Sequence, residues 1–296
     1  MPPAPLQPLR GVRVLSLALN LPGPAALLRC ARMGATCTKL EPPAPAAAAS
    51  ADPMAQYSPT AYAALHTGVR TVQAHLKTPE GQATLQAELS QTDVLITSFR
   101  PSALDKLGLG WETLQVRHPR LSLVRIVGAP GARAEEPGHD LTYLAEADLV
   151  PDTALPPTLY ADMGGALMAS EAVLQAQLAR AQQGLGVCIE VALSDAAHWL
   201  ALPRQWRLTT PEADIGGQHA GYRVYPCADG RVAVAALEPH FAAKLCQIAG
   251  LPAQGDADHM RAPATHAAIA SFLARHTCAT LQALAKAHDI PLHPLP

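Results

Sequence analysis

Two side chains suited to proton transfer frame one short stretch of the chain, residues 138–165, GHDLTYLAEADLVPDTALPPTLYADMGG. His139 stands near its start and Asp162 near its end. An imidazole and a carboxylate are the side chains that most readily move protons near neutral pH. Each is predicted at a junction between a turn and a helix, where free backbone amides can meet an anion. The stretch therefore predicts a site for proton transfer or nucleophilic attack.

Asp162 is followed by an alanine-rich, apolar-periodic run, MGGALMASEAVLQAQLAR, which predicts a long helix beginning at or just after the aspartate. The positive end of the helix dipole would keep the carboxylate ionised at pH 7, available as a base or nucleophile. The backbone amides from Met163 to Gly165 would be free to bind an oxygen that becomes negatively charged during a reaction. A purely structural interpretation stays open, because aspartate is also a preferred helix N-cap.

Composition limits the classes of partner. The chain has 296 residues, 49% hydrophobic and 16% charged, with a net charge of −2, which is typical of a globular protein and argues against nucleic-acid or anionic-membrane partners. The opening lacks the order of a signal peptide, and no run of about 18 apolar residues occurs, so we expect a cytoplasmic protein. The six cysteines show no CxxC and no close Cys/His pairing, which argues against zinc and a disulfide framework.

Short apolar runs alternate with helical segments through the first two thirds of the chain, which predicts an α/β fold with a parallel, Rossmann-like sheet covered on both faces. The first turn, in LPGPAA, has one glycine and no GxGxxG, which excludes NAD and FAD. Residues 42–58 are predicted to form an exposed linker. The predicted strands are 12–17, 36–41, 71–76, 93–98, 121–127 and 187–193. The predicted helices run from Pro22 to about 33 and over 79–89, 103–116 (two short helices), 162–183 and 194–202.

Ligands of such sheets bind beyond the carboxyl ends of the strands, which places the expected binding edge at residues 20–23, 41, 98–100 and 128 onward. Beyond about Pro203 the character changes: a hairpin with Asp229-Gly230 at its turn is followed by helices predicted at 239–249, 263–275 and 278–288. We therefore predict a large α/β domain over 1–203, which includes residues 138–165, and a smaller α+β domain over 204–296.

Several motifs stand in the order found in one enzyme family. In chain order they are LPGPAALLRCARMGATCTKLEPP, LKTPEG, SFRPSALDKLGLGWETL, HPRL, then GHDLTY and ADMGGALMA in the stretch above, and YRVYPCADGRVAVAALEPHF. Together they cover most of residues 9–250. The chain resembles the family III CoA-transferases (CaiB/BaiF), and most closely their α-methylacyl-CoA racemase branch.

The resemblance implies a CoA-binding large domain and an acyl-CoA thioester as substrate, with no permanently bound cofactor and no metal. It places His139, Asp162 and Glu238 on the acid/base positions of the racemase branch. Inversion at the α-carbon needs one group to remove a proton from one face and another to return it to the other face. The residues implied to bind coenzyme A are Lys39, Arg70, Arg100, Lys106, Gly164 and Gly165.

Two other functions stay open. In CoA transfer, Asp162 would attack the thioester and form an acyl-aspartyl anhydride. Alternatively, the chain is a degenerate, non-catalytic paralogue or partner subunit. The family assembles as interlocked homodimers, so a homodimer is expected. Relatives usually continue beyond IPLHPLP with a segment that returns to the first domain. We therefore expect the first sheet to expose an apolar face or to bury it by other means.

Overall fold

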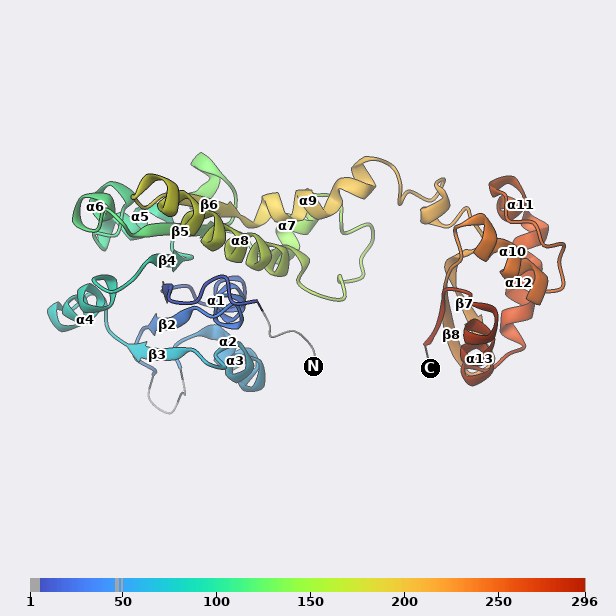
Figure 1. Cartoon of the computed structure of the whole chain (residues 1–296), viewed down its shortest axis with the longest axis horizontal. Coiled ribbons are helices and arrows are strands. Elements are labelled where there is room, and N and C mark those ends of the chain that lie inside the picture. The colour runs from blue at the N-terminus through green and yellow to red at the C-terminus, as the bar shows by residue number, and fades with distance from the viewer. Residues whose placement is uncertain (1–5, 46–47, 49, 296) are drawn as a thin grey trace. The chain divides into compact units, whose positions relative to one another are not determined.

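The computed structural model describes residues 6–45, 48 and 50–295, and the chain divides into two compact units, Met1–Ala201 and Leu202–Pro296 (Figure 1). Among the described residues, no helix is both long and apolar enough to cross a membrane.

The first unit is built on a six-stranded sheet in which every neighbouring pair is parallel, in the order β3-β2-β1-β4-β5-β6 (Figure 1). This confirms the predicted α/β fold with a Rossmann-like parallel sheet. The strands are β1 (Arg13–Ser16), β2 (Thr36–Glu41), β3 (Arg70–Gln73), β4 (Val94–Thr97), β5 (Ser122–Val127) and β6 (Cys188–Ala192).

Helices connect the strands and cover the sheet. One of them, α4, follows its predicted span, because Thr78 Oγ1 accepts a 3.1 Å hydrogen bond from Gly81 N–H and proline occupies the first helical position. The helices are α1 (Pro22–Arg32), α2 (Pro53–Tyr57), α3 (Pro59–Leu65), α4 (Pro79–Leu89), α5 (Pro101–Lys106), α6 (Trp111–Arg117), α7 (Asp140–Glu146), α8 (Tyr160–Gln183) and α9 (Leu193–Gln205).

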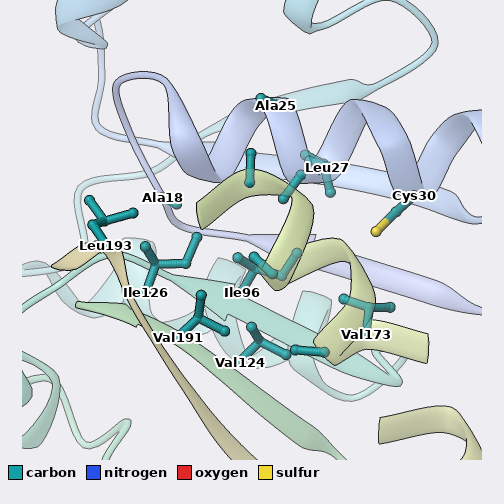
Figure 2. Close-up of a cluster of buried hydrophobic side chains, with 14 of the residues drawn as sticks. Ala18, Ala25, Leu27, Cys30, Ile96, Val124, Ile126, Val173, Val191 and Leu193 are labelled. Atoms are coloured by element: carbon teal, nitrogen blue, oxygen red, sulfur yellow. The ribbon is translucent and has the colours of Figure 1, made fainter. Parts of the chain in front are cut away.

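Alternate residues of the central strands enter two different cores, because successive side chains of a strand point to opposite faces. Val14, Ile96 and Val124 pack with α1 and α8, and Figure 2 shows part of that cluster, including Val173 of α8. Their neighbours, exemplified by Leu95, join a leucine-rich cluster with α4, α5 and α6 on the other face. Each fully buried leucine or valine contributes about 1.5–3 kcal/mol. The doubly covered sheet therefore provides a rigid platform for the loops at its edge.

The predicted exposed linker over residues 42–58 is wrong in its second half. Helix α2 forms there, and Ser50 and Asp52 are fully buried. Their side chains bind the buried charges of β2: Ser50 Oγ donates to Glu41 Oε1 at 2.7 Å, and Asp52 forms an ion pair with Lys39. Composition could not show this, because the partners of these polar residues lie on a strand. Residues 46–47 and 49 of this segment lie outside the described residues.

The second unit has an antiparallel sheet in the order β7-β8-β9, packed with helices into a separate core. The predicted hairpin is confirmed, with its turn at Ala228 and Asp229, one residue earlier than predicted, because Gly230 already pairs with Cys227 as the first residue of β8. Sequence patterns missed α11 and β9; proline at 294 is tolerated because β9 is an edge strand. The elements are β7 (Tyr222–Cys227), β8 (Gly230–Ala235), α10 (Pro239–Ile248), α11 (Ala257–Arg261), α12 (Pro263–Ala274), α13 (Cys278–His288) and β9 (Leu292–Leu295).

Candidate active site

A cavity of about 180 Å³ opens where the segments following β1, β4 and β5 meet the crossover from α7 to α8. The chain runs outward from β1 through β2 to β3 and then returns past β1 to β4. This reversal between β1 and β4 is the switch point at which doubly wound sheets bind ligands. The polar side chains on its wall belong to Asn20, Ser98, Arg100, Glu136, His139, Tyr143 and Asp162. The predicted binding edge had four segments, and those after β1, β4 and β5 line this cavity.

Asp162 occupies the third position of α8, which begins at Tyr160. The predicted helix start at or after Asp162 is therefore wrong, and so is the N-cap interpretation, since Leu159 occupies the cap position. The cap comes from a distant residue instead: Asp140 Oδ1 accepts a 2.9 Å hydrogen bond from Asp162 N–H. A carboxylate reaching in from α7 thus satisfies one of the amides that a helix start leaves unpaired.

The pKa of Asp162 is raised from 3.8 to about 6, first by burial and then by the nearby charge of Asp140, while His139 acts in the opposite direction. The helix dipole would have predicted a lowered pKa, so desolvation and the second carboxylate outweigh it. At pH 7 the group is still about nine-tenths ionised. Asp162 is thus a base whose proton affinity is close to the neutral range, as general-base catalysis requires.

The amides predicted to bind a negatively charged oxygen are engaged within the helix. Met163 N–H donates to Leu159 O at 3.0 Å, and Gly164 and Gly165 follow in the second turn, where amides donate along the helix. These two glycines meet a packing requirement. A Cβ at Gly165 would lie 2.2 Å from Leu193 Cδ2, and one at Gly164 would lie 3.3 Å from Ala196 Cβ. The pair therefore allows close approach to the start of α9.

His139 holds the cap position of α7 through its backbone. Its N–H donates to Thr142 Oγ1 at 3.1 Å, and the Thr142 hydroxyl donates to the His139 carbonyl oxygen at 2.7 Å. The exposed imidazole contributes to the cavity wall, as does the carboxylate of Asp162. One cavity therefore holds an imidazole and a carboxylate carried by two different helices.

Sequence reasoning missed Tyr143, whose buried side chain also lines the cavity. Its hydroxyl fits between two glycines: a Cβ at Gly128 or Gly138 would lie 2.3 Å or 2.5 Å from Tyr143 Oη. Burial raises the pKa of Tyr143 and the charge of Asp162 raises it further, so the hydroxyl keeps its proton and can donate a hydrogen bond. The signal in the sequence was the pair Gly128 and Gly138, because residues without a side chain leave room for the phenol ring.

Lys39 does not line the cavity. Its side chain is fully buried, with Nζ 3.3 Å from Glu41 Oε2 and in an ion pair with Asp52. Asp52 Oδ1 also accepts a 3.0 Å hydrogen bond from the backbone N–H of Asn20, which takes a left-handed conformation (φ 65°) at the cavity wall. The ammonium group is thus committed to a buried network that positions the loop after β1.

The other predicted residues lie at different places. Arg100, at the start of α5, is exposed and lines the cavity. Lys106 ends the same helix, and Arg70 pairs with Glu88; neither lines the cavity. Glu238 is exposed at the cap position of α10 in the second unit. Of the predicted set, the first unit therefore brings together His139, Asp162 and Arg100.

The chain is thus a doubly wound α/β unit with an imidazole and a carboxylate at its switch point, followed by an α+β unit. The model of CoA-transferase family III matches residues 9–296, and the chain belongs to that family.

Its relatives include proteins named for each of the two reactions expected from the sequence, CoA transfer and racemisation. The probable fatty acyl-CoA transferase Rv3272 of Mycobacterium tuberculosis is 28% identical over 84% of this chain and 70% of its own length. Human α-methylacyl-CoA racemase is 30% identical over 82% of this chain and 65% of its own. The succinate–glutarate CoA-transferase of Agrobacterium fabrum is 30% identical over 84% and 68%. These matches span about two thirds of the relatives' lengths.

The fold agrees with solved structures. The crystal structure of Rv3272 superposes with a TM-score of 0.78 at 25% identity, covering 97% of this chain and 85% of that one. A CaiB/BaiF family protein from Brucella suis gives a TM-score of 0.80 and shares the fold.

Proposed function

We propose that this chain catalyses α-proton transfer on a 2-methylacyl-CoA thioester, with His139 and Asp162 as opposed bases. The observation that carries the proposal is that both side chains line one cavity while coming from the starts of different helices. The α-proton of a thioester is weakly acidic, so a half-buried base with a pKa of about 6 suits its removal.

In the proposed reaction the Asp162 carboxylate takes the α-proton, and the C–H electron pair moves into the carbonyl to form an enolate. His139, protonated, then gives a proton to the opposite face of the same carbon, which regenerates the thioester with inverted configuration. The Tyr143 hydroxyl donates a hydrogen bond to the enolate oxygen, a role that the helical amide of Met163 cannot fill.

The cavity is smaller than the roughly 300–1,000 Å³ of pockets that enclose a drug-sized ligand, so it holds the reacting end of the thioester. Arg100 belongs to the cavity wall and is exposed, and we assign its guanidinium to the phosphates of coenzyme A, which would lie outside the cavity. Lys39 is left out because its charge is already paired in the core. Arg70 and Lys106 are weaker candidates, and Glu238 is retained as the third acid/base residue on the family resemblance alone.

CoA transfer is the second candidate, favoured by the equal identity to the succinate–glutarate CoA-transferase and to the racemase. In that reaction an Asp162 oxygen attacks the thioester carbonyl, CoA leaves as a thiolate, and an acyl-aspartyl anhydride remains. A second carboxylate then attacks the acyl carbon and frees the Asp162 carboxylate. The CoA thiolate attacks the carbonyl that came from the second acid, and the first acid leaves as a carboxylate. This reaction needs Asp162 as its one covalent centre and needs no opposed base.

The deciding experiment incubates the protein in deuterium oxide with 2R and 2S 2-methylacyl-CoA, with and without a free carboxylic acid. Deuterium at the α-carbon of both enantiomers supports the racemase proposal. CoA transfer to the acid without deuterium at the α-carbon would overturn it in favour of the transferase. If neither occurs and millimolar CoA leaves the melting temperature unchanged, the non-catalytic paralogue is favoured, since a ligand at about 100 times its Kd adds about 2.7 kcal/mol of stability.

We also propose a cytoplasmic homodimer. Three apolar side chains in the first turns of α8 and in the middle of α9 are exposed: Met163 at 42%, Leu167 at 50% and Leu200 at 43%. Such a patch on the first unit is a surface that a second copy would shield from water.

A further inference from the structure

Three potential metal ligands converge in the second unit, on elements that supply nothing to the cavity described above. Cys227 ends β7, Asp229 stands in the turn before β8, and Cys278 begins α13. One ligand atom of each lies within 4.8 Å of the others. The two cysteines are separated by 51 residues, which is why neither CxxC spacing nor cysteine counting indicated them.

The distances match a metal coordination shell. With Zn–S bonds of about 2.3 Å and tetrahedral angles, two cysteine sulfurs lie about 3.8 Å apart, and a sulfur and a carboxylate oxygen about 3.6 Å apart. Here Cys227 Sγ is 3.6 Å from Cys278 Sγ and 3.8 Å from Asp229 Oδ1. Little movement is therefore needed to place one ion between the three groups.

The ligands are also held in place without an ion. Cys278 N–H donates to Asp229 Oδ1 at 2.7 Å, and Ala228 N–H donates to the His276 carbonyl oxygen at 3.0 Å, so the hairpin turn is tied to the segment that starts α13. A site whose ligands are already oriented by neighbouring hydrogen bonds loses less conformational freedom when an ion binds.

We propose that Cys227, Asp229 and Cys278 form a binding site for a thiophilic divalent cation of the zinc type. Both thiols release their protons to solvent on binding, and the two thiolates and the carboxylate then leave the site with a net charge of −1. The half-exposed position of both cysteines leaves a fourth coordination place for water. The expectation from cysteine spacing that the chain has no zinc site is replaced by this proposal.

A disulfide is the competing use of the same pair, and the structure holds both cysteines as free thiols. The sulfurs are 3.6 Å apart, whereas a disulfide bond is about 2.05 Å long. A bound cation would stabilise both groups as thiolates and so compete with their oxidation.

The test titrates the full chain, reduced with a phosphine, with Co²⁺ and then with Zn²⁺. We expect one Co²⁺ per chain, with tetrahedral d–d bands and a thiolate charge-transfer band that Zn²⁺ displaces. Cys227→Ser combined with Cys278→Ser should abolish both bands, and Cys188→Ser, a half-buried cysteine of the first unit, should keep them. Asp229→Asn should keep the charge-transfer band and weaken binding about tenfold or more.

A readout without substitution guards against misfolded variants. Zn²⁺ should protect Cys227 and Cys278 of the wild type from alkylation, as mapped by mass spectrometry, and leave Cys188 as reactive as before. Bands that persist in the double variant, or thiols alkylated equally with and without Zn²⁺, would overturn the proposal. So would a Cys227–Cys278 disulfide that forms in air as fast with Zn²⁺ as without it, since the pair would then be a redox dithiol.

Discussion

The carboxylate of Asp140 accepts a 2.9 Å hydrogen bond from the backbone N–H of Asp162, so two acidic residues are held together at the start of α8. Asp140 is almost fully buried, which keeps its charge close to Asp162 with little water between them. This is the second largest cause of the raised pKa of Asp162, after burial. The carboxylate of Asp140 therefore both caps the start of α8 and raises the pKa of Asp162.

The pH dependence of α-proton exchange should report this pairing. Because protonated Asp162 cannot act as a base, exchange from the enantiomer it serves should be lost as pH falls through about 6. Asp140→Asn keeps an oxygen that can accept the Asp162 N–H and removes the like charge. It should shift the acid limb of kcat/KM to lower pH by about 0.5–1 unit. An unchanged limb would show that Asp140 acts only as a helix cap.

The two opposed bases predict one-sided losses. His139→Ala should abolish deuterium exchange from one enantiomer of a 2-methylacyl-CoA, and Asp162→Asn should abolish it from the other, because each base exchanges the proton on its own face. The measurement is mass spectrometry of the recovered thioester after incubation in deuterium oxide. Loss of all turnover in Asp162→Asn, with hydroxylamine trapping Asp162 in the wild type, would identify a covalent transferase instead.

Arg100 and Lys106 form a matched pair for the phosphate contact, since both belong to the α5 region and only Arg100 lines the cavity. Arg100→Ala should raise the Kd for coenzyme A about tenfold or more, because a charge-assisted hydrogen bond to phosphate contributes on the order of 2 kcal/mol. Lys106→Ala should change it by less than about threefold. Calorimetric titration of both variants decides this, and equal effects would place the phosphates elsewhere.

The Tyr143 hydroxyl should matter to the rate more than to binding. Tyr143→Phe keeps the ring between Gly128 and Gly138 and removes the donor. Exchange should slow about 100-fold in kcat with a nearly constant KM, as for the loss of one oxyanion donor. Tyr57→Phe, an exposed residue of α2, is the control and should have no effect. A change in KM alone would reassign Tyr143 to substrate binding.

The proposed homodimer is tested by light scattering at micromolar concentration. A mass near twice 31.0 kDa is expected. Leu167→Glu would place a charge in the exposed apolar patch of α8 and should shift the protein toward a monomer. A monomeric mass for the wild type would contradict the dimer and leave the patch to another partner.

The sequence predicted most of the framework because the strands are short apolar runs whose pattern is local. β2 was placed over its full length, and α4 was placed from its Thr78 cap. What failed depended on contacts between distant segments. The start of α8 was misplaced because its cap comes from Asp140, 22 residues earlier.

The difference between local patterns and contacts of distant segments also explains which site residues the sequence predicted and which it missed. His139 and Asp162 were visible as residue types at helix starts, and the structure places both on one cavity. The burial of Lys39 was not visible, because its partner Asp52 lies in a segment of linker-like composition. The approach of Cys227 to Cys278 was hidden in the same way, since it depends on how α13 packs beside the hairpin.

The bond from Asn20 N–H to Asp52 gives the loop after β1 an unusual property. That amide proton stands at the cavity wall, yet its acceptor is the carboxylate that also neutralises buried Lys39. Releasing the proton to solvent takes one donor from Asp52 Oδ1 in the core, while Oδ2 keeps its pair with Lys39, and a buried polar atom that loses a hydrogen bond costs about 1–3 kcal/mol. Hydrogen exchange at Asn20 should therefore be slower than in the exposed loops of the unit, and the buried carboxylate stabilises the entrance loop.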